Sequence, residues 1–164
     1  MAEALEAWFR ANNGYLHKGI NVLHSETAGF HLCADSSIPS DTTIASAPHS
    51  MTLSYLNALV DDEFPVFRQQ KQRFKVEAIG FFYLMTQYVN RDQSFWKPYL
   101  DVLPQPEDDF SQPLFFESPE DITWLRGTDV WHTVTARQDV YKEYYHSGIA
   151  VLQEAGIDVA PYTW

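Results

Sequence analysis

The chain has 164 residues, 45% of them hydrophobic and 15% aromatic, so it can bury a core and a wholly disordered chain is excluded. Its 22 acidic and 11 basic residues give a formal net charge of −11. This excess of acids repels phosphate, which argues against binding to nucleic acid or to an anionic membrane surface. A basic protein segment is the kind of partner that such a charge attracts.

Cysteine usage and the N-terminal sequence predict an intracellular protein, cytoplasmic or nuclear. The single cysteine, Cys33, cannot form an internal disulfide, and its position in an apolar run predicts a buried thiol. The start, Met-Ala-Glu-Ala-Leu-Glu, lacks the basic and apolar regions of a signal peptide. No apolar run approaches the roughly 20 residues that a membrane span needs.

Residues 1–65 are predicted to form a short helix and then a small β-sheet. Apolar residues at 5–9 favour the helix, and Asn12-Asn13-Gly14 is a strong stop signal. Short β-branched or alternating runs, separated by Pro39, Pro48 and polar turn residues, predict strands. The predicted strands cover residues 20–23, 30–33, 43–47 and 51–53.

Residues 66–164 are predicted to be mostly helical. Apolar residues at helical spacing predict a largely buried helix over 74–89, in which Gly80 is expected to allow a close packing contact. Ser118 and Pro119 predict the start of a helix that runs to about residue 126. A last long helix, with apolar residues from 130 to 152, is predicted to end at Gly156. The predicted fold class is therefore α+β, with a small N-terminal sheet followed by a mostly helical region.

The residues that could carry generic chemistry favour structural roles. His17, His24, His31 and His49 do not have the spacing of a metal site, so no metal is predicted. The acids at 107–109 are interpreted as a solvated loop. The basic residues between 68 and 75 are interpreted as a solvated helix face. These four residues are Arg68, Lys71, Arg73 and Lys75.

Several strings occur in a fixed order along the chain. The most specific is SFWKPYLDVLP at residues 94–104; the others are WFRANNGY at 8–15, GFHLCA at 29–34, IASAP at 44–48, QPLFF at 112–116 and ITWLRGT at 122–128. Together they resemble the N-terminal portion of SET-domain proteins of the Rubisco large-subunit methyltransferase-like group, including its fungal members. On this resemblance, residues 1–65 are a partial SET β-sheet and residues 66–164 belong to the helical insert of that domain.

The resemblance implies a protein-lysine N-methyltransferase that uses S-adenosylmethionine. The first SET strands lie near this cofactor in the family, which nominates Gly29, Phe30, His31 and Leu32 as cofactor-binding residues. The family usually has an acid where Ala28 stands and a second glycine where His31 stands, so a plain turn role for Gly29 remains an alternative. The string at 94–104 is interpreted as a structural anchor in which Trp96, with Pro98 and Tyr99, packs the insert helices onto the sheet.

No catalytic residue is nominated, because the family's Asp-x-x-Asn-His motif and catalytic tyrosine follow the insert and no Asn-His pair occurs in this chain. Three hypotheses follow. In the first, the chain is the front part of a methyltransferase-like protein and is inactive as a truncated polypeptide. In the second, it is a non-catalytic interaction module that binds a partner or self-associates through an exposed sheet edge. In the third, it is a remnant scaffold in which a cleft beside His31 serves another chemistry.

Overall fold

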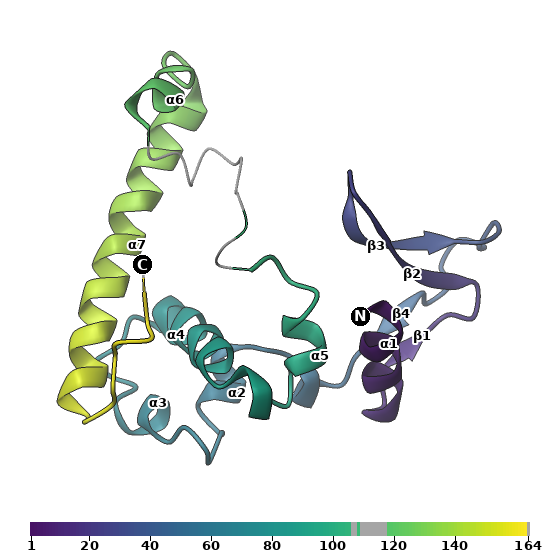
Figure 1. Cartoon of the computed structure of the whole chain (residues 1–164), viewed down its shortest axis with the longest axis horizontal. Helices are drawn as coiled ribbons and strands as arrows, with labels where there is room; N and C mark the ends of the chain where they lie inside the picture. Colours follow the sequence, from purple (N-terminus) through teal and green to yellow (C-terminus); the bar gives the residue numbers. More distant parts are fainter. Residues whose placement is uncertain (106–107, 109–117, 164) are drawn as a thin grey trace.

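The computed structural model describes residues 1–105, 108 and 118–163, and these form an α+β fold. Figure 1 shows a β-hairpin at one end of the molecule and a helical body at the other. The longest helix, α7 (Asp129–Glu154), runs along the side of the body that faces away from the hairpin. The final residues fold back beside this helix. Residues 112–116 of the QPLFF string, and the acids Glu107 and Asp109, lie outside the described residues.

The N-terminal region begins with α1 (Ala2–Ala11), which confirms the predicted opening helix. Asn12 caps its C-terminus and Asn13 has a φ of 64°, a conformation that asparagine tolerates better than most residues, so the stop signal acts as predicted. The N–H of Gly14 then donates to the carbonyl oxygen of Phe9 at 2.8 Å, which turns the chain toward the first strand.

Four strands follow, in two separate antiparallel pairs. The pairs are β1 (Tyr15–Leu16) with β4 (Ala45–Ser46), and β2 (Ile20–Ser25) with β3 (Gly29–Ala34). The predicted strands at 20–23 and 30–33 are confirmed, whereas the one at 43–47 is only two residues long. The prediction of a strand at 51–53 is wrong, because residues His49–Met51 form a 3₁₀ helix, η1, after Pro48.

Three short elements connect the strands to the helical body. Helix α2 (Tyr55–Ala58) begins at Ser54, whose hydroxyl accepts a hydrogen bond from the N–H of Asn57. Helix α3 (Val66–Gln69) follows Pro65 and buries Val66 and Phe67. The side chains of all four bases between 68 and 75 are exposed, but α3 ends at Gln69, so they do not form one helix face.

The core is built around α4 (Val76–Val89), which confirms the predicted buried helix. Its Ile79, Phe82 and Tyr83 are at most 2% exposed, and they pack against α2, α3 and the C-terminal half of α7. Burial, together with a hydrogen bond from the Tyr83 hydroxyl to Asp61, raises the pKa of that hydroxyl. Ala58 of α2 joins this cluster although it precedes residue 65. The domain boundary at residue 65 stays a prediction.

Gly80 does not make the close contact that was predicted for it. A Cβ at this position would lie 3.8 Å from its nearest neighbour, the backbone nitrogen of Tyr55, which is an ordinary van der Waals distance. The close contact lies instead at Gly148 of α7, where a Cβ would overlap the ring of Phe82. The two longest helices therefore meet through a glycine that sequence periodicity did not single out.

The string at 94–104 follows η2 (Arg91–Gln93) and forms a turn and α5 (Lys97–Leu100). Trp96 is 7% exposed, and its indole N–H donates to the carbonyl oxygen of Met51 at 3.1 Å. Its ring packs edge-on against Tyr83, and the ring of Phe95 contacts Trp8 of α1. The anchor therefore joins α4, η1 and α1 rather than the sheet, and Tyr99, at 38% exposure, is not part of it.

The C-terminal helices begin largely as predicted. Ser118 caps α6 (Pro119–Thr123), its hydroxyl accepting from the N–H of Glu120, but this helix ends three residues before residue 126. Helix α7 covers the whole predicted length, and Gly156, with a φ of 80°, follows its C-terminus.

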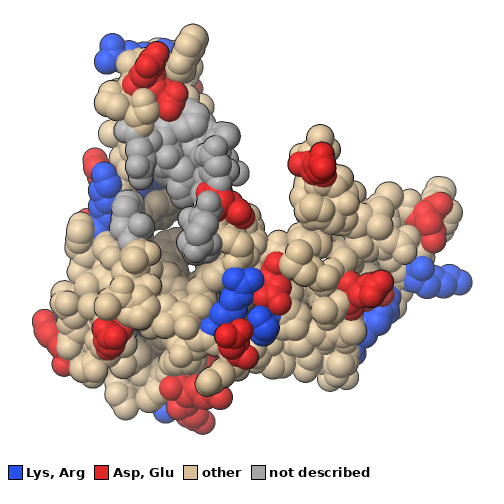
Figure 2. All heavy atoms as spheres, viewed as in Figure 1, with Lys and Arg blue, Asp and Glu red and all other residues tan. Residues whose placement is uncertain are grey.

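Within the described residues, no helix has the length and apolar character to cross a membrane. On the face drawn in Figure 2, acids and bases are interspersed over largely uncharged surface.

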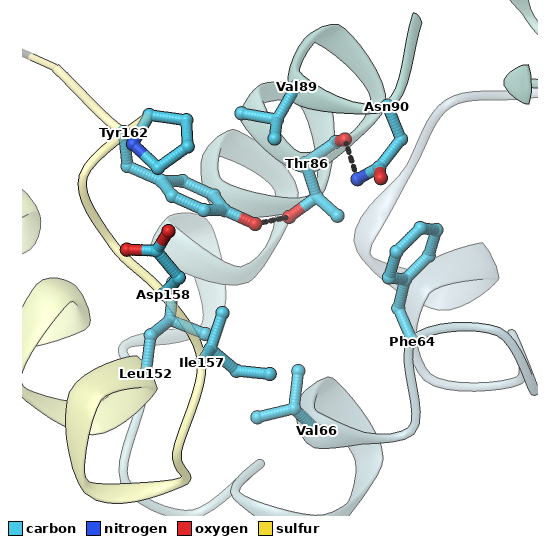
Figure 3. Close-up of a pocket in the computed structure, with 10 residues that line it drawn as sticks. Phe64, Val66, Thr86, Val89, Asn90, Leu152, Ile157, Asp158 and Tyr162 are labelled. Atoms are coloured by element: carbon cyan, nitrogen blue, oxygen red, sulfur yellow. Dashed lines mark hydrogen bonds between the residues drawn. The ribbon is translucent and has the colours of Figure 1, made fainter. Parts of the chain in front are cut away.

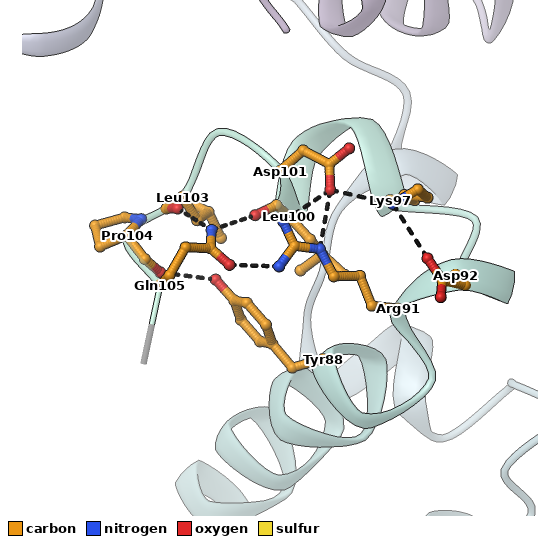
Figure 4. A network of polar contacts seen from close by, with 9 residues as sticks. All are labelled: Tyr88, Arg91, Asp92, Lys97, Leu100, Asp101, Leu103, Pro104 and Gln105. Atoms are coloured by element: carbon orange, nitrogen blue, oxygen red, sulfur yellow. Dashed lines mark hydrogen bonds and ion pairs between the residues drawn. The ribbon is translucent and has the colours of Figure 1, made fainter. Parts of the chain in front are cut away.

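Arg91 organises a polar network where α4 meets α5 (Figure 4). Its guanidinium donates to Asp101 at 2.9 Å and to Gln105, while Lys97 lies 3.4 Å from both Asp101 and Asp92. Burial pushes the pKa of Asp101 upward, but the hydrogen bonds from Arg91 and Lys97 outweigh it and hold the pKa below its ordinary value. The network fixes residues 101–105 against the end of α4.

The lowered pKa of Asp101 predicts a pH-dependent contribution to stability. We expect wild type to be more stable than Asp101→Asn at pH 7, because the amide oxygen of asparagine can accept these hydrogen bonds but lacks the negative charge that strengthens them. Since the folded pKa lies below the unfolded one, this difference is constant above pH about 5 and shrinks as pH falls below about 4. Urea unfolding at several pH values measures it. Asp92→Asn, whose side chain is 94% exposed, is the control; equal profiles for both variants would contradict the prediction.

Candidate functional site

The nominated residues lie on the β2–β3 hairpin. Its register pairs Ile20 with Ala34 at the open end and Ser25 with Gly29 at the turn. Among the described residues each of these strands has one strand partner, so each leaves one backbone edge without a ladder. Backbone N–H and C=O groups along such an edge can bind an extended chain or a ligand.

Gly29 begins β3 immediately after the turn at residues 26–28. The N–H of Ala28 donates to the Ser25 hydroxyl at 3.1 Å, and Gly29 itself has a φ of 60°. Apart from Gly29 itself and its two neighbours in the chain, a Cβ at this position would meet no atom within 4 Å. The positive φ therefore explains the glycine by itself, and the turn role that the sequence left open as an alternative is present in the structure.

Substitutions at Gly29 test this turn role. Gly29→Ala is expected to lower the free energy of unfolding by about 1–2 kcal/mol, because a left-handed conformation places Cβ against backbone. Gly29→Asn should cost less, since asparagine visits this region more readily. Urea unfolding of both variants checks the order. If alanine were tolerated as well as asparagine, the strain argument would fail.

The four nominated residues share a strand but not a face. Residues directly opposite one another in an antiparallel pair point to the same side, so Phe30 and Leu32 share a face with His24 and Val22. The rings of His24 and Phe30 lie 4.7 Å apart on that face. His31 points to the other face beside Leu23, and its Nδ1 lies 3.0 Å from the Gly29 carbonyl oxygen.

This arrangement fits one wall of a cofactor site. Phe30 and Leu32, the latter 52% exposed, offer an apolar surface for a flat group, and the backbone edge of β3 offers hydrogen bonds to polar atoms. That surface is open to solvent at Leu32. Contact between Gly29, Phe30, His31, Leu32 and S-adenosylmethionine remains a prediction.

Cys33 is exposed, so the prediction of a buried thiol is wrong. It lies opposite Asn21 on the same face as His31 and Leu23. An apolar strand predicts burial only when both faces of its sheet are covered, and the hairpin has two strands with a largely exposed surface. Leu23 and Leu32, on opposite faces, are also 44% and 52% exposed.

The other groups considered from the sequence do not converge on one place. His24 and His31 occupy opposite faces of the hairpin, and no cluster of three or more metal-ligating side chains occurs in the described part of the chain. Two of the bases pair with acids: Arg68 with Asp62 at 3.2 Å and Arg73 with Glu154. Both pairs are exposed and contribute little to stability.

A pocket of about 320 Å³ lies in the helical body, away from the hairpin (Figure 3). Its lining comes from the loop before α3 and the first residue of α3, from the end of α4, from α7 and from the residues after α7. The lining residues are Phe64, Val66, Thr86, Val89, Asn90, Leu152, Ile157, Asp158, Pro161 and Tyr162. Sequence reasoning missed this site because its residues are spread over almost a hundred positions and contain no motif.

Curated proteins with similar sequences are methyltransferases. The chain is 27% identical over 138 residues to the actin-histidine N-methyltransferase of Papio anubis, 28% over 139 residues to that of Gallus gallus, and 26% over 138 residues to that of Homo sapiens. These alignments cover 79–80% of this chain and 22% of each relative, so the chain spans about a fifth of their length. No protein-family profile matches the chain. On this similarity, the chain is a methyltransferase-like protein.

Proposed function

We propose that the chain is the N-terminal part of a SET-domain protein N-methyltransferase that uses S-adenosylmethionine. The observation that carries this proposal is the similarity, along four-fifths of the chain, to actin-histidine N-methyltransferases. The ordered strings that resemble the SET group, and the sequence of small sheet and then helices, support it. The assignment to the Rubisco large-subunit methyltransferase-like group rests on those strings alone.

The chain's part in this function is to supply scaffold and one cofactor wall. When bound, S-adenosylmethionine supplies the methyl group. The hairpin residues 29–32 orient the cofactor through backbone and apolar contacts, and the Trp96 anchor fixes the helical body against α1. No Asn-His pair occurs in the 164 residues, and no residue is proposed as catalytic. We therefore propose that this polypeptide alone transfers no methyl group.

The acceptor is proposed to be a nitrogen of a protein side chain. The relatives' names specify a histidine of actin, whereas the SET resemblance implies lysine. The histidine assignment rests on relatives that are 26–28% identical to this chain, whereas lysine rests on the resemblance of short strings. Histidine is therefore the first acceptor to test and lysine the second. The acidic character of the chain would attract a basic segment around either residue.

Cofactor binding tests the proposal directly. Backbone amide NMR of the 164-residue chain, titrated with S-adenosylhomocysteine, is expected to show shifts centred on residues 29–32 that do not saturate at micromolar ligand, because one wall gives weak binding. Tritium transfer from labelled S-adenosylmethionine to actin, or to histidine and lysine peptides, should stay at the blank level. Shifts confined to the helical body, or measurable methyl transfer, would contradict the proposal.

A non-catalytic interaction module is a second candidate, favoured by the exposed leucines and unpaired edges of the hairpin. On this proposal the chain self-associates through a strand edge. Light scattering should then show a dimer in wild type and a monomer in Leu32→Lys, while Val60→Lys, at a 71% exposed position outside the hairpin, should leave the dimer intact. A monomeric wild type would contradict the self-association.

A further inference from the structure

We infer that the pocket beside α4 and α7 binds a small organic ammonium ion, meaning a primary amine carried on an apolar ring or chain. This inference goes beyond the proposed methyltransferase function and concerns residues that lie in the helical body rather than in the hairpin. It rests on the size of the pocket, on its apolar lining and on the kind of polar atoms that it presents.

The size and lining of the pocket suit an apolar body of one ring. Its volume is about 320 Å³, whereas an apolar cavity of roughly 150 Å³ already holds benzene. The apolar lining grades from rim to floor, since Val89 is 40% exposed and Leu152 only 1%. Phe64 and Val66 lie across the pocket from Tyr162 (Figure 3), so a ring between them would be covered on both sides.

The deepest polar groups are arranged as hydrogen-bond acceptors. Thr86 and Tyr162 are 3% and 5% exposed, and their hydroxyl oxygens lie 3.0 Å apart. The Thr86 hydroxyl donates its proton to the carbonyl oxygen of Phe82 at 2.8 Å, so Tyr162 must be the donor between the two. With its proton engaged, the Tyr162 oxygen can only accept a hydrogen bond from a ligand.

The polar groups nearer the rim also present acceptors. Asn90 donates one Nδ2 hydrogen to the Thr86 carbonyl oxygen at 2.9 Å, which leaves its Oδ1 as an acceptor and its second Nδ2 hydrogen as a donor. Asp158 accepts from the N–H of Ala160 at 3.0 Å through one carboxylate oxygen and retains a second. Figure 3 shows Asp158 beside the Tyr162 ring.

This set, in which acceptors and one carboxylate outnumber the single free donor, selects the charge of the ligand. Among the described residues that line the pocket there is no Lys, Arg or His, so a carboxylate or phosphate ligand would face Asp158 without a compensating base. A neutral apolar ligand would leave the buried Tyr162 oxygen without a donor. A primary ammonium supplies three N–H donors and a positive charge, and the faces of Tyr162 and Phe64 also attract cations.

Three probes of nearly equal shape test the inference on the whole 164-residue chain. Backbone amide NMR titrations use phenethylamine, the neutral 2-phenylethanol and the anionic phenylacetate at neutral pH. Phenethylamine is expected to shift the amides of residues 86–90 and 157–162 and to saturate in the millimolar range. The dissociation constant of phenethylamine should be about fivefold below that of 2-phenylethanol. This ratio corresponds to the upper end of the free energy that an exposed ion pair contributes. Phenylacetate should not reach saturation.

Two charge-matched variants separate a local contact from the general acidity of the chain. Asp158→Asn keeps Oδ1 as the partner of the Ala160 N–H and should weaken phenethylamine about fivefold while leaving 2-phenylethanol unchanged. Asp62→Asn removes the same charge at an 89% exposed site outside the pocket and should change neither ligand. Val89→Trp, at the rim, should weaken both ligands by filling the pocket.

The same chemistry can come from a free amine or from the side chain of a lysine, and N-acetyl-lysine methylamide distinguishes these sources. Tighter binding of phenethylamine indicates a free amine, and tighter binding of the lysine derivative indicates a peptide. The inference is overturned if the three phenyl probes bind equally, if both Asn variants weaken phenethylamine alike, or if no amine shifts the pocket amides.

Discussion

Replacing Gly148 by alanine is expected to lower the free energy of unfolding by up to about 2 kcal/mol, even though alanine is the better helix former. The helix gains about 1 kcal/mol from the substitution. The added Cβ, however, would overlap the ring of Phe82, which is 2% exposed. That ring is held between Phe74, Tyr145 and Tyr162, so it cannot move aside without disturbing the core, and overpacking of this kind costs about 1–3 kcal/mol.

Gly80→Ala is the matched control for this prediction, and its expected sign is opposite. Gly80 also lies inside a long helix, but a Cβ there would be 3.8 Å from its nearest neighbour. We expect this variant to gain about 0.5–1 kcal/mol from helix propensity alone. Urea unfolding of the two variants measures both changes. A gain at both positions would mean that α4 and α7 are not in close contact at Gly148.

The contrast between these glycines shows which parts of the fold can be predicted from sequence. Helices α4 and α7 follow from apolar spacing, and the turns at Asn13 and Gly156 follow from residues that accept a positive φ. These are local signals. Which glycine lies at a helix contact depends on how two helices cross, and the spacing of apolar residues within one helix does not contain that information.

The strand predictions fail for a related reason. The run at 51–53 contains Met51, which joins the buried side of η1, and Leu53, and so short a run does not distinguish a strand from a 3₁₀ turn. Cys33 lies in a correctly predicted strand, yet its burial depends on what covers the sheet. Among the described residues the hairpin is covered too little to bury it.

The candidate sites divide in the same way. The hairpin residues 29–32 are consecutive in the sequence, so a resemblance of six residues was enough to nominate them. The pocket combines Phe64, Thr86 and Asp158 with Tyr162, and it exists only because the residues after α7 fold back onto α4. Its polar residues are ordinary in composition, and their arrangement as acceptors appears only with the hydrogen bonds.

The largest loss of stability is expected at Trp96. Trp96→Ala should lower the free energy of unfolding by about 3–5 kcal/mol, the usual cost of removing a buried large aromatic ring. The side chain is 7% exposed, it packs edge-on against Tyr83, and its indole N–H is the hydrogen-bond donor to the Met51 carbonyl oxygen, which is buried with it. Truncation removes the packing and leaves that carbonyl without its donor.

Two further substitutions assign this loss to the anchor. Trp96→Phe keeps most of the ring but removes the N–H, and we expect it to cost about 1–3 kcal/mol, because the Met51 carbonyl loses its partner while most of the packing remains. Trp124→Ala removes a tryptophan that is 81% exposed and should change stability by less than about 0.5 kcal/mol. Equal losses at Trp96 and Trp124 in urea unfolding would refute the anchor. We expect Trp96→Ala to be more destabilising than Trp96→Phe, and Trp124→Ala to have no effect. This order would mean that the most specific string in the sequence serves stability, because Trp96 and Phe95 hold α1, η1 and α4 together.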